Sequence, residues 1–121
     1  MSIYYTESHE SITVDGNIAT LNLTDYAIEQ LGDLVYIEMP ELDAEFEKGD
    51  SIVVVESVKA ASDTYAPVSG KIVEVNEAAV DEPSVVNELD PQTGWLVRIE
   101  MSDVSELEAL MDTQAYEAFS D

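Results

Sequence analysis

The chain has 121 residues, a size that fits one compact domain, and we expect residues 1–121 to form it. It carries 27 Asp and Glu against four Lys and Arg, which gives a formal net charge of −23. Such a charge excludes nucleic-acid binding, because phosphate contacts need clustered Lys and Arg, and it also disfavours binding to an anionic membrane. The absence of cysteine excludes disulfides, thiolate catalysis and cysteine-bound zinc.

Targeting signals and metal motifs are missing from the sequence. Residues 1–10 lack the basic start and apolar stretch of a signal peptide, and the longest aliphatic run, 52–55, is far too short for a membrane span. We therefore expect a soluble, cytoplasmic protein. His9 is the only histidine, so we expect no metal site and read it as a packing or hydrogen-bonding residue.

The first half of the chain predicts strands around one short helix. Residues 11–14 and 18–23 alternate apolar and polar side chains, and the Asp-Gly-Asn sequence between them is typical of a hairpin turn. A helix is predicted over 25–31, with Thr24 or Asp25 as its cap and Gly32 as its stop. A further strand over 34–39 ends at Pro40.

The second half predicts more strands and then a change of period. Strands are predicted over four segments rich in β-branched residues: 51–58, 62–68, 71–75 and 95–101. Ser102 or Asp103 followed by Glu106 indicates a capping box, with Val104, Leu107, Leu110 and Met111 on one helical face. A second helix over 113–119 is expected to pack Tyr116 and Phe119 onto the sheets, so that C-terminal helices span about 103–119. The pattern predicts a mainly β fold with peripheral helices.

Lys59 is the residue best placed to carry chemistry. It lies between the predicted strands 51–58 and 62–68, at the tip of a hairpin within residues 49–75. Its neighbours Ala60, Ala61 and Ser62 are small, so a modifying enzyme could reach the amine. A solvated turn lysine is the commoner interpretation of any single lysine, but this chain has only four basic residues. No arrangement of catalytic side chains is apparent, so we do not expect an enzyme.

The sequence around Lys59 resembles the H protein of the glycine cleavage system. The similarity is strongest over 55–63 (VESVKAASD) and continues through 66–70 (APVSG) and 74–77 (EVNE). Matching segments occur in order along nearly the whole chain, at 8–10, 18–20, 24–27, 30–33, 86–87, 94–95, 105–107 and 115–119. A colinear set of this length is far more specific than one short motif.

The resemblance implies a fold, a cofactor and site residues. The fold would be a barrel-sandwich hybrid of two small antiparallel sheets. Lys59 would carry lipoate in an amide bond, and Glu56, Ser57, Val58, Ala60 and Asp63 would complete the lipoylation motif. The loaded arm would fold back into a cleft that contains Ser8, Glu10 and Asp63. In this interpretation the cofactor supplies the chemistry, and the protein presents and protects it.

The resemblance also implies partners. The protein would carry an aminomethyl group from a pyridoxal-phosphate glycine decarboxylase to a tetrahydrofolate-dependent aminomethyltransferase, and electrons to a dihydrolipoyl dehydrogenase. A lipoylating enzyme would be a fourth partner. Tethering raises the effective concentration of the arm at each docked enzyme.

Other functions of the same fold stay open. They are a lipoyl-relay donor to 2-oxoacid dehydrogenases, an unmodified interaction module and a biotin carrier, although the flanks Val58 and Ala60 lack the methionines usual for biotin. Two departures from the family pattern stand out. Ser11 replaces the usual Trp, which removes a ring near Glu10, and Asp90-Pro91-Gln92 replaces a Pro-Tyr pair.

Overall fold

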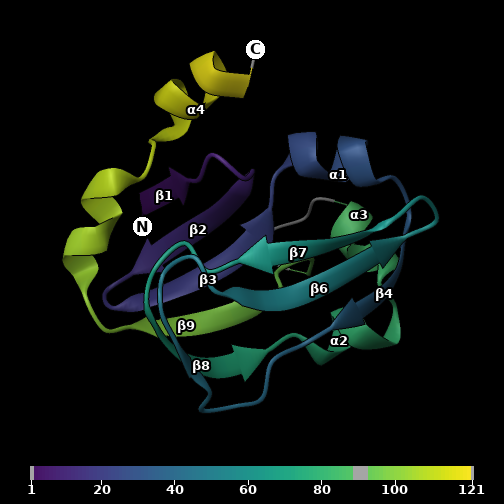
Figure 1. Cartoon of the computed structure of the whole chain (residues 1–121), viewed down its shortest axis with the longest axis horizontal. Coiled ribbons are helices and arrows are strands. Elements are labelled where there is room, and N and C mark those ends of the chain that lie inside the picture. Colours follow the sequence, from purple (N-terminus) through teal and green to yellow (C-terminus); the bar gives the residue numbers. More distant parts are fainter. Residues whose placement is uncertain (1, 89–92, 121) are drawn as a thin grey trace.

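The computed structural model describes residues 2–88 and 93–120, which form two antiparallel sheets (Figure 1). The larger sheet has the order β1-β2-β3-β9-β8-β5 and the smaller the order β4-β6-β7. The strands of the larger sheet are β1 (Ser2–Tyr5), β2 (Glu10–Asp15), β3 (Ile18–Leu23), β9 (Val97–Met101), β8 (Gly70–Val75) and β5 (Glu45–Phe46). Those of the smaller sheet are β4 (Leu34–Glu38), β6 (Ser51–Ser57) and β7 (Ala61–Tyr65). This arrangement confirms the predicted mainly β fold of two antiparallel sheets.

Short helices lie around the edges of the two sheets (Figure 1). They are α1 (Asp25–Leu31), α2 (Glu77–Asp81), α3 (Ser84–Asn87), the 3₁₀ helix η1 (Val104–Ala109) and α4 (Thr113–Ser120). None of the helices within residues 2–88 and 93–120 has the length and apolar character that a membrane span requires.

The hydrophobic core lies between the facing surfaces of the two sheets. Ile12, Leu21 and Ile99 of the larger sheet and Val53 and Val55 of the smaller are essentially inaccessible to solvent and belong to one cluster. Burying a side chain of this size stabilises the native state by roughly 1.5–3 kcal/mol. Because the surface charge repels itself, this apolar core is the main term that holds the chain compact.

The local sequence explains the β2–β3 hairpin and helix α1, which lie next to the candidate site described below. Asp15 pairs with Ile18, so Gly16 and Asn17 form a two-residue turn, and Gly16 alone of these two has a positive φ, as in a type II′ turn. Helix α1 begins after Thr24, whose hydroxyl accepts a hydrogen bond from the Ala27 N–H, and ends at Gly32, with φ of 79°. Both caps agree with the prediction.

Several elements differ from the prediction at their ends or were not predicted. The strand predicted over 62–68 stops at Tyr65, because Pro67 cannot donate a ladder hydrogen bond and the chain turns there toward β8. The strand predicted over 95–101 begins at Val97. Strands β1 and β5 and helices α2 and α3 were missed, since all four have at most five residues and too few positions to show a period.

The predicted capping box at the C-terminal segment is wrong. Asp103 is the N-cap, but Glu106 does not reach back to it; its carboxylate accepts hydrogen bonds from the Ser69 N–H and hydroxyl, at 2.7 and 2.9 Å. The segment forms a 3₁₀ helix, and Glu106 connects it to Ser69, the residue before β8. Leu107 and Leu110 pack against the core, whereas Val104 is 54% exposed and does not share their buried face.

Gly70 is the glycine whose replacement should disturb the larger sheet most. A Cβ at this position would lie 2.2 Å from the backbone oxygen of Glu100 on the neighbouring strand β9. We expect Gly70→Ala to lower the free energy of unfolding by about 3 kcal/mol, because backbone must move to admit the methyl group. Gly16→Ala is the control: it meets no atom within 4 Å, so only its positive φ should matter, at about 1 kcal/mol. Equal losses in urea unfolding would contradict this account.

Candidate functional site

The turn between β6 and β7 is organised by the side chain of Ser57. Its hydroxyl donates to the Ala60 carbonyl and accepts from the N–H groups of Lys59 and Ala60, each at 3.1 Å. The Ser57 N–H also donates to the Ala60 carbonyl at 2.8 Å. The buried hydroxyl therefore satisfies the polar backbone groups of the turn and leaves the residues at its tip free to face solvent.

Lys59 lies at this tip, as predicted. Val58, Lys59 and Ala60 are all exposed. The aliphatic part of the Lys59 side chain lies beside Gly32, where a Cβ would be 3.5 Å from the lysine Cε. The Val58 N–H donates to the Asp33 carbonyl, which ties the turn to the end of α1. Within residues 2–88 and 93–120 Lys59 forms no ion pair, so its ammonium has no carboxylate partner.

A cleft of about 160 Å³ lies beside α1 and contains the three predicted cleft residues. Ser8 and Glu10 come from the loop before β2 and the start of that strand, and Asp63 comes from β7. The remaining walls are mainly apolar or aromatic: His9, Leu23, Tyr26, Ala27, Gln30, Leu31, Val55, Ser62 and Thr64. The structure thus brings together Ser8, Glu10 and Asp63, which lie as much as 55 residues apart in the sequence.

Glu10 is the buried acid of this cleft, with only 3% of its surface exposed. Its carboxylate accepts hydrogen bonds from the Thr6 hydroxyl at 2.7 Å and from the Tyr65 N–H at 3.2 Å. Burial raises the pKa of the Glu10 carboxyl, and hydrogen bonds from Thr6, Tyr65 and Ser8 offset only part of that increase. Among the described residues Glu10 forms no ion pair, so its carboxylate could accept a cationic group.

Asp63 and Glu56 are more exposed than Glu10. The Asp63 carboxylate accepts a hydrogen bond from the Ser51 hydroxyl at 3.0 Å, across the β6–β7 hairpin. Glu56 is exposed and pairs with Ala61 in the same hairpin. Ser8 is also exposed. These three polar side chains are open to a ligand or a partner, whereas Glu10 is fixed in place.

Ser11 faces away from the cleft, which corrects the expectation that it alters the surroundings of Glu10. Successive side chains of a strand point to opposite faces, so Glu10 faces inward and Ser11 outward. Ser11 lines a separate surface groove of about 490 Å³, which it shares with Tyr116 of α4. A Trp at position 11 would occupy this groove rather than the cleft. The other departure, at residues 90–92, lies outside the described residues.

An aromatic cluster beside the cleft was missed by sequence reasoning. His9 lines the cleft, and its ring stacks on Tyr26 with centroids 4.0 Å apart. Its Nδ1 lies 2.7 Å from the hydroxyl of Tyr116, which itself stacks on Tyr5. Tyr116 packs onto β1 as predicted, while Phe119 contacts His9 and Tyr116 and stays 47% exposed. No short-range signal could have joined His9 to a residue 107 positions later.

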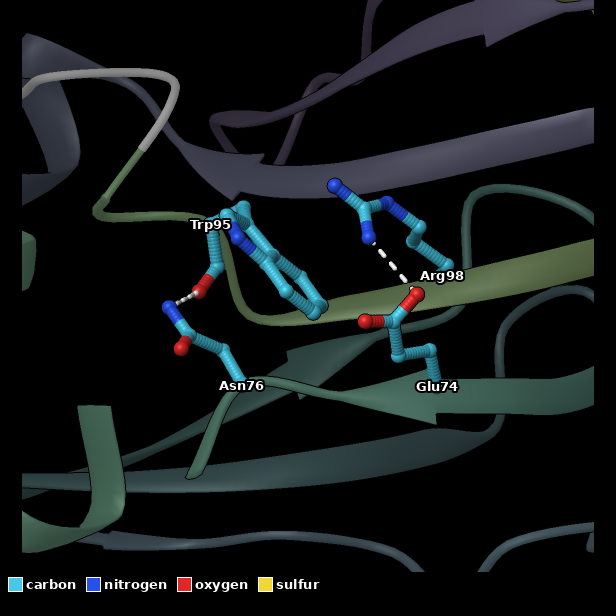
Figure 2. A network of polar contacts seen from close by, with 4 residues as sticks. All are labelled: Glu74, Asn76, Trp95 and Arg98. Carbon is cyan, nitrogen blue, oxygen red and sulfur yellow. Dashed lines mark hydrogen bonds and ion pairs between the residues drawn. The ribbon is translucent and has the colours of Figure 1, made fainter. Parts of the chain in front are cut away.

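Arg98 has a structural role on the outer face of the larger sheet (Figure 2). Its guanidinium lies 2.6 Å from the Glu74 carboxylate and 4.2 Å from the centroid of the Trp95 ring. Trp95, which the sequence predicted to pack against the core, is 8% exposed. Asn76 supports the Trp95 backbone by donating to its carbonyl at 2.8 Å. The Arg98 charge is thus already paired.

The described residues hold no cluster of three or more potential metal ligands.

The raised pKa of Glu10 predicts that the difference in stability between the wild type and Glu10→Gln depends on pH. Because the native state holds a proton on Glu10 more tightly than the unfolded chain does, its ionisation lowers stability as the pH rises through the native-state pKa. Glu10→Gln removes this titration. We therefore expect Glu10→Gln to gain stability relative to the wild type from about pH 4 to about pH 7 in urea unfolding.

Glu7→Gln is the matched control, since it removes the same charge from an exposed position in the same loop. Subtracting its effect corrects for the change in net charge. A wild-type protein that gains stability relative to Glu10→Gln over this pH range would contradict the stated burial effect.

The chain is similar to known proteins over nearly its whole length. Residues 3–121 match the family model described as glycine cleavage H-protein. Glycine cleavage system H proteins of Thermotoga maritima and Bartonella quintana are 50% and 47% identical, over 95% and 94% of this chain and 93% of each relative. A crystal structure of a glycine cleavage system H protein from Mycobacterium marinum superposes with a TM-score of 0.87 at 35% identity, covering 97% of this chain and 94% of that one. The chain belongs to the glycine cleavage H-protein family.

Proposed function

We propose that this protein is a lipoyl carrier in which Lys59 bears lipoate and the cleft shelters the group that the arm carries. The observation that carries the proposal is an exposed lysine, with no ion pair among the described residues, at a hydrogen-bonded hairpin turn beside a cleft with a buried carboxylate. In glycine cleavage the carried group would be aminomethyl. The protein would have no catalytic activity of its own.

The turn fits a lysine that a modifying enzyme must acylate. The Lys59 ammonium is free of carboxylate partners among the described residues, so the amine needs no ion pair to be broken before it reacts. The neighbours Val58 and Ala60 are exposed, and Val58 keeps 68% of its surface accessible although it is apolar. We assign Glu56, Ser57, Val58, Ala60 and Asp63 to recognition by the lipoylating enzyme, with Ser57 fixing the shape of the turn.

The cleft fits an arm that is apolar along its length and cationic at its end. Leu23, Leu31 and Val55 supply apolar wall, and Ser8, Glu10 and Asp63 supply oxygen atoms. When bound, the lipoyl group supplies two sulfur atoms, which can hold the carried group and accept electrons. A buried carboxylate would hold the ammonium of an aminomethyl group by a charge-assisted hydrogen bond.

The path from Lys59 to the cleft follows the end of α1. The Lys59 side chain lies against Gly32, the residue that ends the helix, and the two preceding residues, Gln30 and Leu31, line the cleft. An arm extended from Lys59 across this helix end would therefore enter the cleft beside Leu31. This continuity supports a resting position for the arm on the protein itself.

The acidic surface supports transient docking to several enzymes. A net charge of −23 would steer the protein toward basic surfaces on its partners, and complementary charge raises association rates more than affinity. The partners in this proposal are glycine decarboxylase, the aminomethyltransferase, dihydrolipoyl dehydrogenase and the lipoylating enzyme.

Modification by a lipoate ligase with ATP tests the proposal. We expect the mass of the intact wild-type protein to increase by one lipoyl group, and peptide mapping to locate it on Lys59. Lys59→Arg keeps the charge but offers no acylatable amine, so its mass should stay unchanged. Lys48→Arg, at another exposed lysine, is the matched control and should be modified like the wild type. An unmodified wild-type protein, or a modified Lys59→Arg, would contradict the proposal.

A further inference from the structure

His9, Tyr116 and Thr24 are joined in a closed set of hydrogen bonds beside the cleft. The His9 Nδ1 lies 2.7 Å from the Tyr116 hydroxyl, which lies 2.9 Å from the Thr24 hydroxyl. The Thr24 hydroxyl in turn lies 3.1 Å from the His9 carbonyl oxygen. The set begins and ends on the same residue, and we call it the His9 cycle.

Counting hydrogens fixes the direction of the cycle. The Thr24 hydroxyl has one hydrogen, and it must go to the His9 carbonyl, because a carbonyl oxygen can only accept. The Tyr116 hydroxyl therefore donates to Thr24, which also accepts from the Ala27 N–H. With its own hydrogen used, the Tyr116 oxygen must accept from His9, so Nδ1 carries a hydrogen. The neutral imidazole is consequently the Nδ1-protonated tautomer.

The cycle holds His9 in a backbone conformation that residues other than glycine seldom adopt. Its φ is 66°, in the left-handed region that disfavours residues with a Cβ. Besides the cycle, the ring is fixed by stacking on Tyr26 and by contact with Phe119. Strain of this kind persists only where several surrounding contacts impose it, and it is found most often at functional sites.

The neighbours of His9 in the chain are the two cleft residues from this loop. Ser8 precedes it and Glu10 follows it, and all three line the same cleft. A change of φ at His9 would rotate Ser8 relative to Glu10. Two segments far away in the sequence, the start of α1 and the C-terminal helix α4, thus determine how this loop faces the cleft.

We propose that His9 is a positioning residue whose hydrogen-bond cycle fixes Ser8 and Glu10 at the cleft. The value of this positioning rests on the proposed function, since an oriented Glu10 matters most if the cleft shelters a cationic group. The cycle also assigns a role to α4, which reaches the site through Tyr116 and Phe119. Removing the Tyr116 hydroxyl opens the cycle without removing the ring that packs on Tyr5.

The tautomer of His9 gives the first test, in the unmodified protein. His9 is the only histidine, so ¹⁵N-histidine labelling gives a single, unambiguous set of ring signals. At a pH where the imidazole is neutral, we expect a protonated Nδ1 and an unprotonated Nε2. Tyr116→Phe should convert His9 to a mixture of tautomers. A wild-type ring protonated on Nε2 would overturn the proposal.

Amide hydrogen exchange at Glu10 tests whether the cycle orders the loop. The Glu10 N–H donates to the Thr6 hydroxyl inside this loop. We expect its exchange to be about fivefold faster in Tyr116→Phe, the factor that corresponds to one lost hydrogen bond. Thr24→Ser keeps the hydroxyl and should exchange like the wild type. Tyr5→Phe is the matched control, because the Tyr5 hydroxyl makes no hydrogen bond within the described chain. Unchanged exchange in Tyr116→Phe would overturn the proposal.

A third measurement separates this inference from the proposed function. In loaded protein without other enzymes, water hydrolyses the aminomethyl group. The carbon–sulfur and carbon–nitrogen bonds break, formaldehyde and ammonium are released, and the sulfur becomes a thiol. We expect this release to be about fivefold faster in Tyr116→Phe, and faster also in Glu10→Gln. Faster release in Glu10→Gln alone would overturn the role of His9. No change in either variant, together with altered tautomer and exchange, would uphold the positioning by His9 and contradict the sheltering role of the cleft.

Discussion

The buried Glu10 carboxylate is the contact on which the arrangement of the cleft depends. Glu10 begins β2 of the larger sheet, and its carboxylate accepts the Tyr65 N–H at the end of β7 in the smaller sheet. The same carboxylate binds the Thr6 hydroxyl and so fixes the loop that contains Ser8. Burying an acid costs free energy, and these hydrogen bonds offset only part of that cost, so the pKa of Glu10 stays raised. One side chain therefore connects both sheets and the loop at a single place.

The lysine turn and the cleft use small hydroxyl side chains in the same manner. Ser57 satisfies the backbone of the β6–β7 turn, and Lys59 at its tip is exposed, with no ion pair in the part of the chain that the structure describes. Thr24 caps α1 and at the same time binds the His9 carbonyl. In both places a hydroxyl satisfies polar backbone groups, and the exposed side chains nearby are not needed for that purpose. The apolar core between the sheets then opposes the repulsion of the acidic surface.

The parts of the fold that local patterns determine could be predicted from the sequence. The hairpin around Lys59, the turn at Gly16 and the caps of α1 follow from β-branched runs, glycine and a capping threonine. The resemblance also named Ser8, Glu10 and Asp63, which the structure brings into one cleft. Contacts made across the fold could not be predicted.

Glu106 illustrates this limit, because its spacing from Asp103 fits a capping box while its carboxylate instead binds Ser69 on the neighbouring segment. The direction of Ser11 could have been inferred from strand alternation once Glu10 was taken as buried. The partnership of His9 with Tyr116 had no such signal, since a hydrogen bond over 107 residues leaves no local pattern.

The account claims that a group carried on Lys59 rests in the cleft beside Glu10, and backbone NMR of the loaded protein tests this most directly. Spectra would be compared between the lipoylated protein and the same protein after loading with the aminomethyl group. The account predicts that the amide signals of Ser8, Glu10 and Asp63 shift on loading, while those of Lys48 and Ser69, which lie outside the cleft, stay in place. Unchanged signals at the three cleft residues in fully loaded protein would contradict it.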